Sequence, residues 1–155
     1  MKQITINGKE YTIIYSFDAV LHKETVQKMF KVLSGAYFVR QGIEGNTEKQ
    51  QVANAMIDGG AEMIADIPHI VKSAFYAGLL EKNPQTEEEA HALMKQYMTE
   101  NKLSYKALFT ELRECMEDDG FFDLSGLTEM LQEMNGTPKK AKKVPQDHKK
   151  QTTTK

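Results

Sequence analysis

The chain has 155 residues, a net charge of −2 at pH 7 and one cysteine, Cys115. This length predicts one domain, and the single cysteine excludes an internal disulfide framework and a zinc site built from several cysteines. The near-neutral charge and the presence of only 2 Arg beside 18 Lys argue against a dedicated nucleic-acid binder, because bidentate reading of bases prefers Arg. No stretch approaches the ~20 apolar residues of a membrane span, and no signal-peptide pattern opens the chain, so we expect a cytoplasmic protein.

Charge is distributed unevenly about Gly136. Residues 1–136 carry 13 Lys and Arg against 21 Asp and Glu, a net charge of −8, whereas residues 137–155 carry 7 Lys against one Asp, a net charge of +6. The second segment has one aliphatic side chain larger than Ala, so burial cannot offset the entropy of ordering it. We predict one folded domain over 1–136 and a disordered Lys-rich tail over 137–155.

The segment 2–15 predicts a β-hairpin. Asn7-Gly8 supplies the two residues of positive φ that a type I′ turn needs, and β-rich runs flank it on both sides. With this turn, Ile6 faces Lys9 and Ile4 faces Tyr11. One face is then apolar, formed by Ile4, Ile6, Tyr11, Ile13 and Tyr15. A lone hairpin is marginal in water, so this face should dock on helices or pair with another chain.

The helical body is predicted over 16–135. Ser16 should cap a first helix that ends near Gly35, and residues 34–46, with three glycines, should form a loop. Thr47 and Gln50 fit a capping box for a short helix, which Gly59-Gly60 should interrupt.

Three further helices follow in the second half of the body. Residues 61–82 predict the most apolar helix, with a kink or a break at Pro68. Thr86 to Glu89 form a strong capping box for the next helix, and Ser104 should cap a helix that ends at Gly120. Asp123 should cap a last helix that ends at Gly136. The fold class is therefore α+β and mostly α-helical, with the hairpin packed on five to six helices.

The sequence contains no recognisable catalytic, cofactor-binding or metal-binding constellation. No two of the four histidines lie at helical i, i+3 or i+4 spacing, and His69 on the apolar helix is predicted to be packed or hydrogen-bonded. Cys115 falls on an apolar stripe and predicts a buried thiol without an activating base. The acidic run 117–123 fails the calcium-loop pattern, because Phe122 and Asp123 stand at the fifth and sixth positions counted from Asp118. We expect no cofactor and no enzyme activity.

Apolar side chains in two segments exceed what one stripe per helix needs. They are either core residues of helices buried on two sides or a surface for a partner helix or subunit. We predict the second role for Phe75, Tyr76, Leu79 and Leu80, and next for Phe121 and Phe122. For self-association, the hairpin residues Ile4, Ile6, Tyr11 and Ile13 are the candidates.

The order of these elements resembles a known family. The strings that carry the resemblance are Ile4–Tyr11 (ITINGKEY), Ser16–Ala19 (SFDA) and Ile70–Leu79 (IVKSAFYAGL), followed by an acidic capped helix and a short charged extension. Over about residues 1–135, this arrangement is similar to the tail assembly chaperones of bacteriophages with long, non-contractile tails and of related prophages.

The resemblance implies a non-enzymatic protein of the host bacterial cytoplasm that is absent from the mature virion. Its partner would be the tape measure protein, which it keeps soluble until tail tube proteins, a further candidate partner, polymerise around it. Homo-oligomers are also expected. Two alternatives remain open: a helical adaptor that oligomerises through its hairpin edge without a phage role, and a nucleic-acid-associated regulator that uses the Lys-rich tail.

Overall fold

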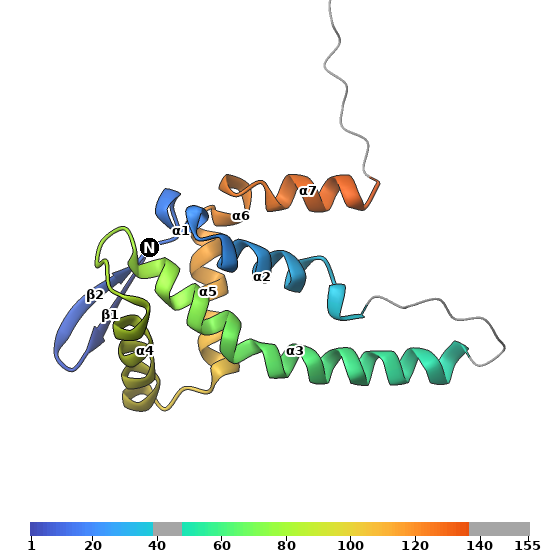
Figure 1. The fold of residues 1–155 in the computed structure, drawn as a ribbon, viewed down its shortest axis with the longest axis horizontal. Helices are drawn as coiled ribbons and strands as arrows, with labels where there is room; N and C mark the ends of the chain where they lie inside the picture. Colours follow the sequence, from blue (N-terminus) through green and yellow to red (C-terminus); the bar gives the residue numbers. More distant parts are fainter. Residues whose placement is uncertain (39–47, 137–155) are drawn as a thin grey trace, which may run out of the picture.

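A computed structural model describes residues 1–38 and 48–136, and Figure 1 shows their arrangement. The fold is mostly helical with an N-terminal hairpin, as predicted, although seven α-helices occur in the described ranges instead of five to six. The elements are β1 (Lys2–Ile6), β2 (Lys9–Ile13), α1 (Phe17–Leu21), α2 (Lys23–Leu33), a short 3-10 helix η1 (Ala36–Phe38), α3 (Glu48–Leu79), α4 (Glu87–Asn101), α5 (Tyr105–Asp118), α6 (Phe121–Leu124) and α7 (Leu127–Met134). No helix among them is long and apolar enough to cross a membrane.

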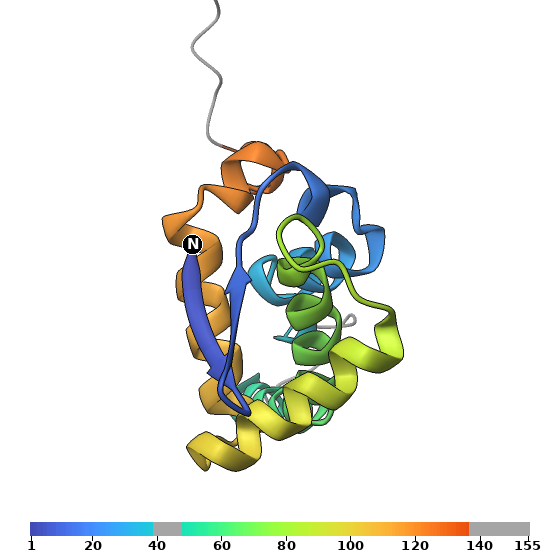
Figure 2. The same ribbon diagram turned by 90° about the vertical axis from the view of Figure 1, so that its left-hand side faces the viewer.

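The hairpin has the predicted register and turn. Ile4 pairs with Tyr11 and Ile6 with Lys9, and Asn7 and Gly8 have φ values of 51° and 76°. Its apolar face is buried, because α3 and α4 contact the strands. On the α5 side, Lys2 forms an ion pair with Glu111, and Figure 2 shows the hairpin between α4 and α5. This burial corrects the prediction for the side chains of Ile4, Ile6, Tyr11 and Ile13, which form core contacts. Self-association through the backbone edge of the hairpin stays a prediction.

Helix α3 is the longest element, and α2, α4 and α5 pack against it. It contacts α2, α4, α5 and β2, and its residues from Ile67 to Leu79 supply much of the core. The predicted interruption at Gly59-Gly60 is wrong, since α3 is continuous from Glu48 to Leu79 and includes Pro68. A glycine pair costs helix stability without forbidding the helical conformation. Pro68 does not break the helix, and Figure 1 shows the axis of α3 changing direction along its length, as a proline kink would allow.

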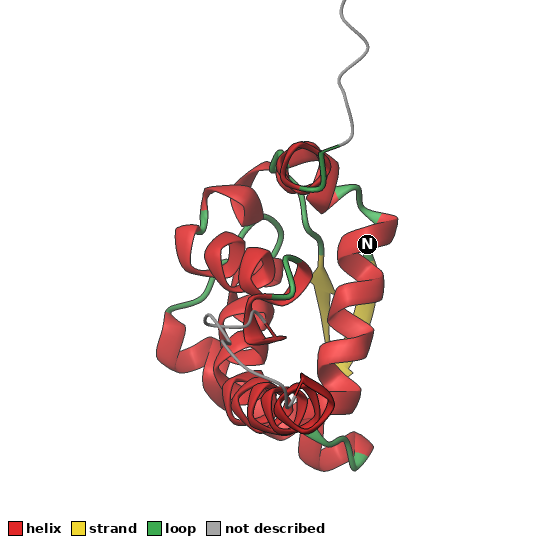
Figure 3. Cartoon of the chain, turned by 90° about the vertical axis from the view of Figure 1, so that its right-hand side faces the viewer, coloured by secondary structure: helices red, strands yellow, loops and turns green. Residues whose placement is uncertain are grey.

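Two predicted helices are divided in the structure. The segment after Ser16 forms α1 and α2, separated at His22, whose backbone is extended with φ −77° and ψ 91°. The last segment forms α6 and α7, separated at Gly126, which has φ 78°. The N-cap of α7 is therefore Gly126 and not the predicted Asp123, which lies inside α6. Each division separates a short helix, α1 or α6, from the helix that follows it (Figures 1 and 3).

The other helix boundaries follow local chemistry. Thr86 and Glu89 form the predicted capping box, and the hydroxyl of Ser104 accepts a hydrogen bond from the Ala107 N–H. Gly120 follows the end of α5 with φ 74°. The predicted cap at Thr47, most of the predicted loop 34–46 and the predicted tail 137–155 lie outside the described residues.

Candidate functional site

Most of the predicted partner residues belong to the core. Phe75, Leu79 and Phe121 are fully buried, and Tyr76 and Phe122 are partly buried against the same core. Leu80 is also partly buried. This corrects the prediction of a partner surface at these residues and confirms the core alternative for the three buried ones. The physical reason is that several elements cover α3 on different sides. Its buried surface is therefore wider than the single apolar stripe of a surface helix.

An apolar groove lies instead between α2 and α7. It has a volume of about 380 Å³. Among the described residues, its lining includes no charged side chain and consists of Val26, Gln27 and Phe30 of α2, the connection Ser125-Gly126, and Leu127 and Met130 of α7. Apolar grooves bordered by helices are typical docking sites for amphipathic helices, which insert side chains from one face.

The first turn of α7 is anchored beside the groove. The positive φ of Gly126 turns the chain, the Ser125 hydroxyl accepts a hydrogen bond from the Leu127 N–H at 3.4 Å, and Leu127 is buried. Further along the same apolar stripe, Met130 and Met134 remain 50% and 58% exposed. Within the described residues, helix α7 thus has an apolar face that is buried at Leu127 and exposed at Met130 and Met134. Met side chains adapt their shape to varied partners, which suits a binding surface.

Three further exposed apolar side chains belong to α1 and α6. Leu124 of α6 directly precedes the groove residue Ser125 and is 42% exposed. Helix α1 contacts α6, and its Phe17 and Leu21 are 73% and 80% exposed. Single exposed apolar residues are ordinary on protein surfaces, but a concentration of them at one site marks an interaction surface. The face formed by α1, α2, α6 and α7 is therefore the best candidate functional site.

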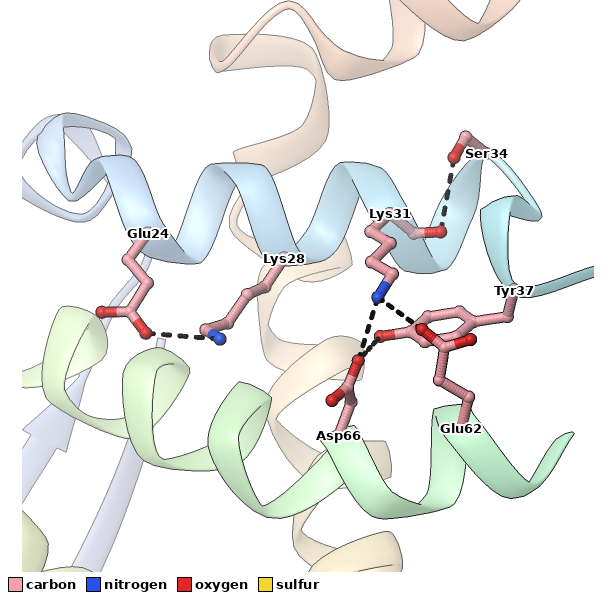
Figure 4. Close-up of polar contacts among 7 residues, drawn as sticks. All are labelled: Glu24, Lys28, Lys31, Ser34, Tyr37, Glu62 and Asp66. Carbon is pink, nitrogen blue, oxygen red and sulfur yellow. Dashed lines mark hydrogen bonds and ion pairs between the residues drawn. The ribbon is translucent and has the colours of Figure 1, made fainter. Parts of the chain in front are cut away.

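A polar cluster fixes the other side of α2 to α3 (Figure 4). The Lys31 ammonium contacts Glu62 Oε1 and Asp66 Oδ2, each at 3.1 Å, and lies 4.4 Å from the ring centroid of Tyr37. Tyr37 donates a hydrogen bond to Asp66 Oδ2 at 2.8 Å. The hydrogen bonds from Tyr37 and Lys31 lower the pKa of Asp66, and burial, together with the bond to Asp66, raises the pKa of Tyr37 to about 12. This cluster joins the last turn of α2 to α3.

A second, polar pocket lies where α2, α3 and α4 meet. Its volume is about 90 Å³, and its lining residues are His22, Glu24, His69, Lys72, Ser73, Tyr76 and Glu87. His69 is exposed at this pocket, so the packed form of the prediction is wrong, and the hydrogen-bonded form stays a prediction. Within the described residues, no three side chains of His, Cys, Asp or Glu are placed to hold a metal ion. Because this lining contains both acidic and basic side chains, it favours neither an anionic nor a cationic ligand.

A chain of hydrogen bonds runs inward from this pocket. Nδ1 of His22 lies 2.7 Å from the Thr25 hydroxyl, which lies 2.7 Å from the Ser73 hydroxyl. Thr25 and Ser73 are buried, so the two hydroxyls satisfy each other and join α2 to α3. The Cys115 thiol is buried as predicted, and burial raises its pKa, so a nucleophilic thiolate is disfavoured. These groups therefore support the fold.

Sequence reasoning missed the groove. Leu127, Met130, Leu131 and Met134 follow the i, i+3, i+4, i+7 pattern, which is the signal of an apolar helix face. The pattern does not show whether the rest of the fold covers that face. No known protein family, curated protein or solved structure matches the chain.

Proposed function

We propose that this protein is a non-enzymatic chaperone that binds amphipathic helices in the α2–α7 groove. The observation that carries the proposal is the uncharged groove of about 380 Å³ with the exposed Met130 at its edge. This volume accommodates a few large aliphatic or aromatic side chains, as a partner helix presents them at i, i+3 or i+4, and i+7. The adjoining residues Phe17, Leu21 and Leu124 would extend the contact.

The resemblance of the chain to phage tail assembly chaperones supports a specific partner, the tape measure protein. Long apolar or amphipathic helices of such a partner would aggregate if they were left bare. A small body with a net charge of −8 over residues 1–136 would cover their apolar face and give the complex a charged, soluble exterior. In this role the protein acts in the host cytoplasm and leaves before the virion is complete.

A direct test is co-expression with a tape measure protein from the same genome. Wild-type protein should keep the tape measure protein soluble and co-purify with it. Met130→Glu, which places a charge at the groove, should abolish both effects while the circular dichroism spectrum stays helical. Ile64→Glu is the matched control, because Ile64 is also an exposed apolar helix residue but lies on α3, away from the groove. If the tape measure protein precipitates equally with and without the wild-type protein, this partner is wrong.

The two alternatives are separated from this proposal by their own experiments. A nucleic-acid-associated regulator would lose its binding on deletion of residues 137–155, which carry a net charge of +6. The chaperone would keep most of its tape measure binding after the same deletion, because its groove lies in the folded body. A helical adaptor without a phage role would bind another amphipathic helix and leave the tape measure protein insoluble.

A further inference from the structure

We infer that the first half of α3 from a second copy of this chain occupies the α2–α7 groove when no partner helix is bound. The α3 arm, defined as residues 48–65, ends just before Asp66, includes Glu62 of the polar cluster, and extends away from the hairpin end of the molecule (Figure 1). It carries the other concentration of exposed apolar side chains in the described residues. Met56, Ile57 and Ile64 are 60%, 68% and 69% exposed.

The exposed side chains of the arm form a face of the type that enters a groove. Ile57 and Ile64 are seven residues apart, so they lie on the same side of the helix, and Met56 flanks them. Gly60 and Ala61 lie between the two isoleucines and allow a close approach to another helix. A Cβ added at Gly60 would meet no atom within 4 Å, so this side of the arm is open.

The distribution of charge on the arm also favours docking through the isoleucine face. Asp58, Glu62 and Asp66 recur every four residues on nearly the opposite side of the arm. Two of these carboxylates are engaged by Lys31, on the side of the arm that faces α2. Among the residues whose side chains the structure describes, the isoleucine face carries no charge, and neither does the groove lining. Docking would therefore desolvate apolar surface on both sides without burying a carboxylate.

The arm of one molecule lies on the wrong side of α2 to fill its own groove. Helix α2 contacts α3 on one side and α7 on the other, and it lies between them in the views of Figures 1 and 3. The Lys31 contacts with Glu62 and Asp66 keep the arm on that far side. A second copy supplies an arm whose apolar face matches the apolar groove. We therefore assign the arm of a second copy as the occupant of the groove.

Arm-in-groove contact joins two different surfaces, so it is heterologous. Each molecule then keeps one free arm or one free groove, and copies add head to tail into a ring or an open chain. A single helix in a groove falls short of the ~1,600 Å² that stable interfaces bury, so we expect assembly to be reversible and to depend on concentration.

The experiment measures the mass of purified full-length protein by sedimentation velocity over a wide range of concentration. Wild-type protein should grow beyond a dimer as concentration rises. Ile64→Glu disables the arm and Met130→Glu disables the groove, so each variant alone should stay monomeric. An equimolar mixture of the two variants should form dimers and nothing larger, because one intact arm then meets one intact groove. Glu is a good helix former, so neither change should unfold its helix.

Several results would overturn the inference. Wild-type protein that stays monomeric at every concentration removes the self-contact. If the mass of Ile64→Glu rises with concentration as it does for wild type, the arm is not part of the contact. If Met130→Glu alone forms dimers, the contact joins two arms. A mixture that remains monomeric excludes the heterologous contact. If Met130→Glu lost its helical spectrum, Gln27→Lys on the exposed opposite wall would replace it, with the same expected results.

A consequence for regulation rests on the proposed function. If a tape measure helix uses the same groove, the arm mimics that helix, and the two compete. A synthetic peptide of an amphipathic tape measure segment should then dissociate wild-type assemblies into monomers, and Ile64→Glu should bind the peptide at least as tightly as wild type. If the variants assemble as predicted in the mixing experiment but the peptide does not dissociate the wild-type assemblies, the arm contact is supported and the competition is excluded. The proposed function itself is judged separately, by the co-expression test.

Discussion

Gly78 of α3 lies directly against Ile13 of β2. A Cβ added at Gly78 would lie 2.6 Å from Cγ2 of Ile13 and 3.2 Å from the ring of Tyr15. The carbonyl of Gly78 also accepts a hydrogen bond from the Ile14 N–H at 2.9 Å. The absence of a side chain at this position thus allows the hairpin to approach α3 closely. The core residues of the two elements are in contact as a result.

Gly78→Ala should destabilise the fold by about 1–3 kcal/mol, because Ile13 and Tyr15 are buried and have no space to move away. The measurement is urea unfolding followed by circular dichroism. Gly60→Ala on the same helix is the matched control: it meets open space and should stabilise the helix by up to ~1 kcal/mol through propensity. Equal effects of the two substitutions would show that the approach of Gly78 to Ile13 is not tight.

The buried hydroxyl pair should behave as a unit. Thr25→Val leaves the Ser73 hydroxyl without its partner at 2.7 Å and should cost about 1–3 kcal/mol of unfolding free energy. Ser73→Ala should cost less, because the Thr25 hydroxyl keeps its contact with Nδ1 of His22. The double variant should lose less than the sum of the two single losses, because no orphaned hydroxyl remains. Strictly additive losses in chemical denaturation would argue against this hydrogen bond.

Tyr37 should titrate with a pKa of about 12, above its usual 10.0, because burial and Asp66 favour the neutral phenol. A group whose pKa is raised by folding stabilises the fold fully below its unfolded value. That contribution is lost as pH rises from 10.0 through about 12. The difference in tyrosinate absorbance between wild type and Tyr37→Phe isolates this group among the six tyrosines. A midpoint near pH 10 would contradict the contact with Asp66.

Local sequence signals predicted the elements that local chemistry determines. The Asn7-Gly8 turn and the Thr86 capping box are short patterns whose geometry depends on neighbouring residues, and both occur in the structure. Gly59-Gly60 has a local preference as well, but continuous helix formation outweighs its cost of about 1 kcal/mol per glycine. A local pattern is thus a good guide where no longer-range contact competes with it.

Burial was harder to predict, because it depends on contacts between distant segments. Phe75 and Leu79 have the apolar character of a binding surface, yet elements from both ends of the chain cover them. Met130 has the character of a core residue, yet the turn at Gly126 leaves it half exposed. The pattern of apolar residues was the same in both cases, and only the tertiary arrangement distinguishes core from groove.

The most direct test of the central claim measures binding of a tape measure helix to the groove itself. A fluorescent peptide from an amphipathic tape measure segment would be titrated with wild type, Met130→Glu and Ile64→Glu, each at concentrations where the protein is monomeric. We predict saturable binding to wild type and to Ile64→Glu, and at least a tenfold loss of affinity for Met130→Glu. Equal affinity of all three proteins, or no binding to any of them, would contradict the assignment of the α2–α7 groove as the partner site.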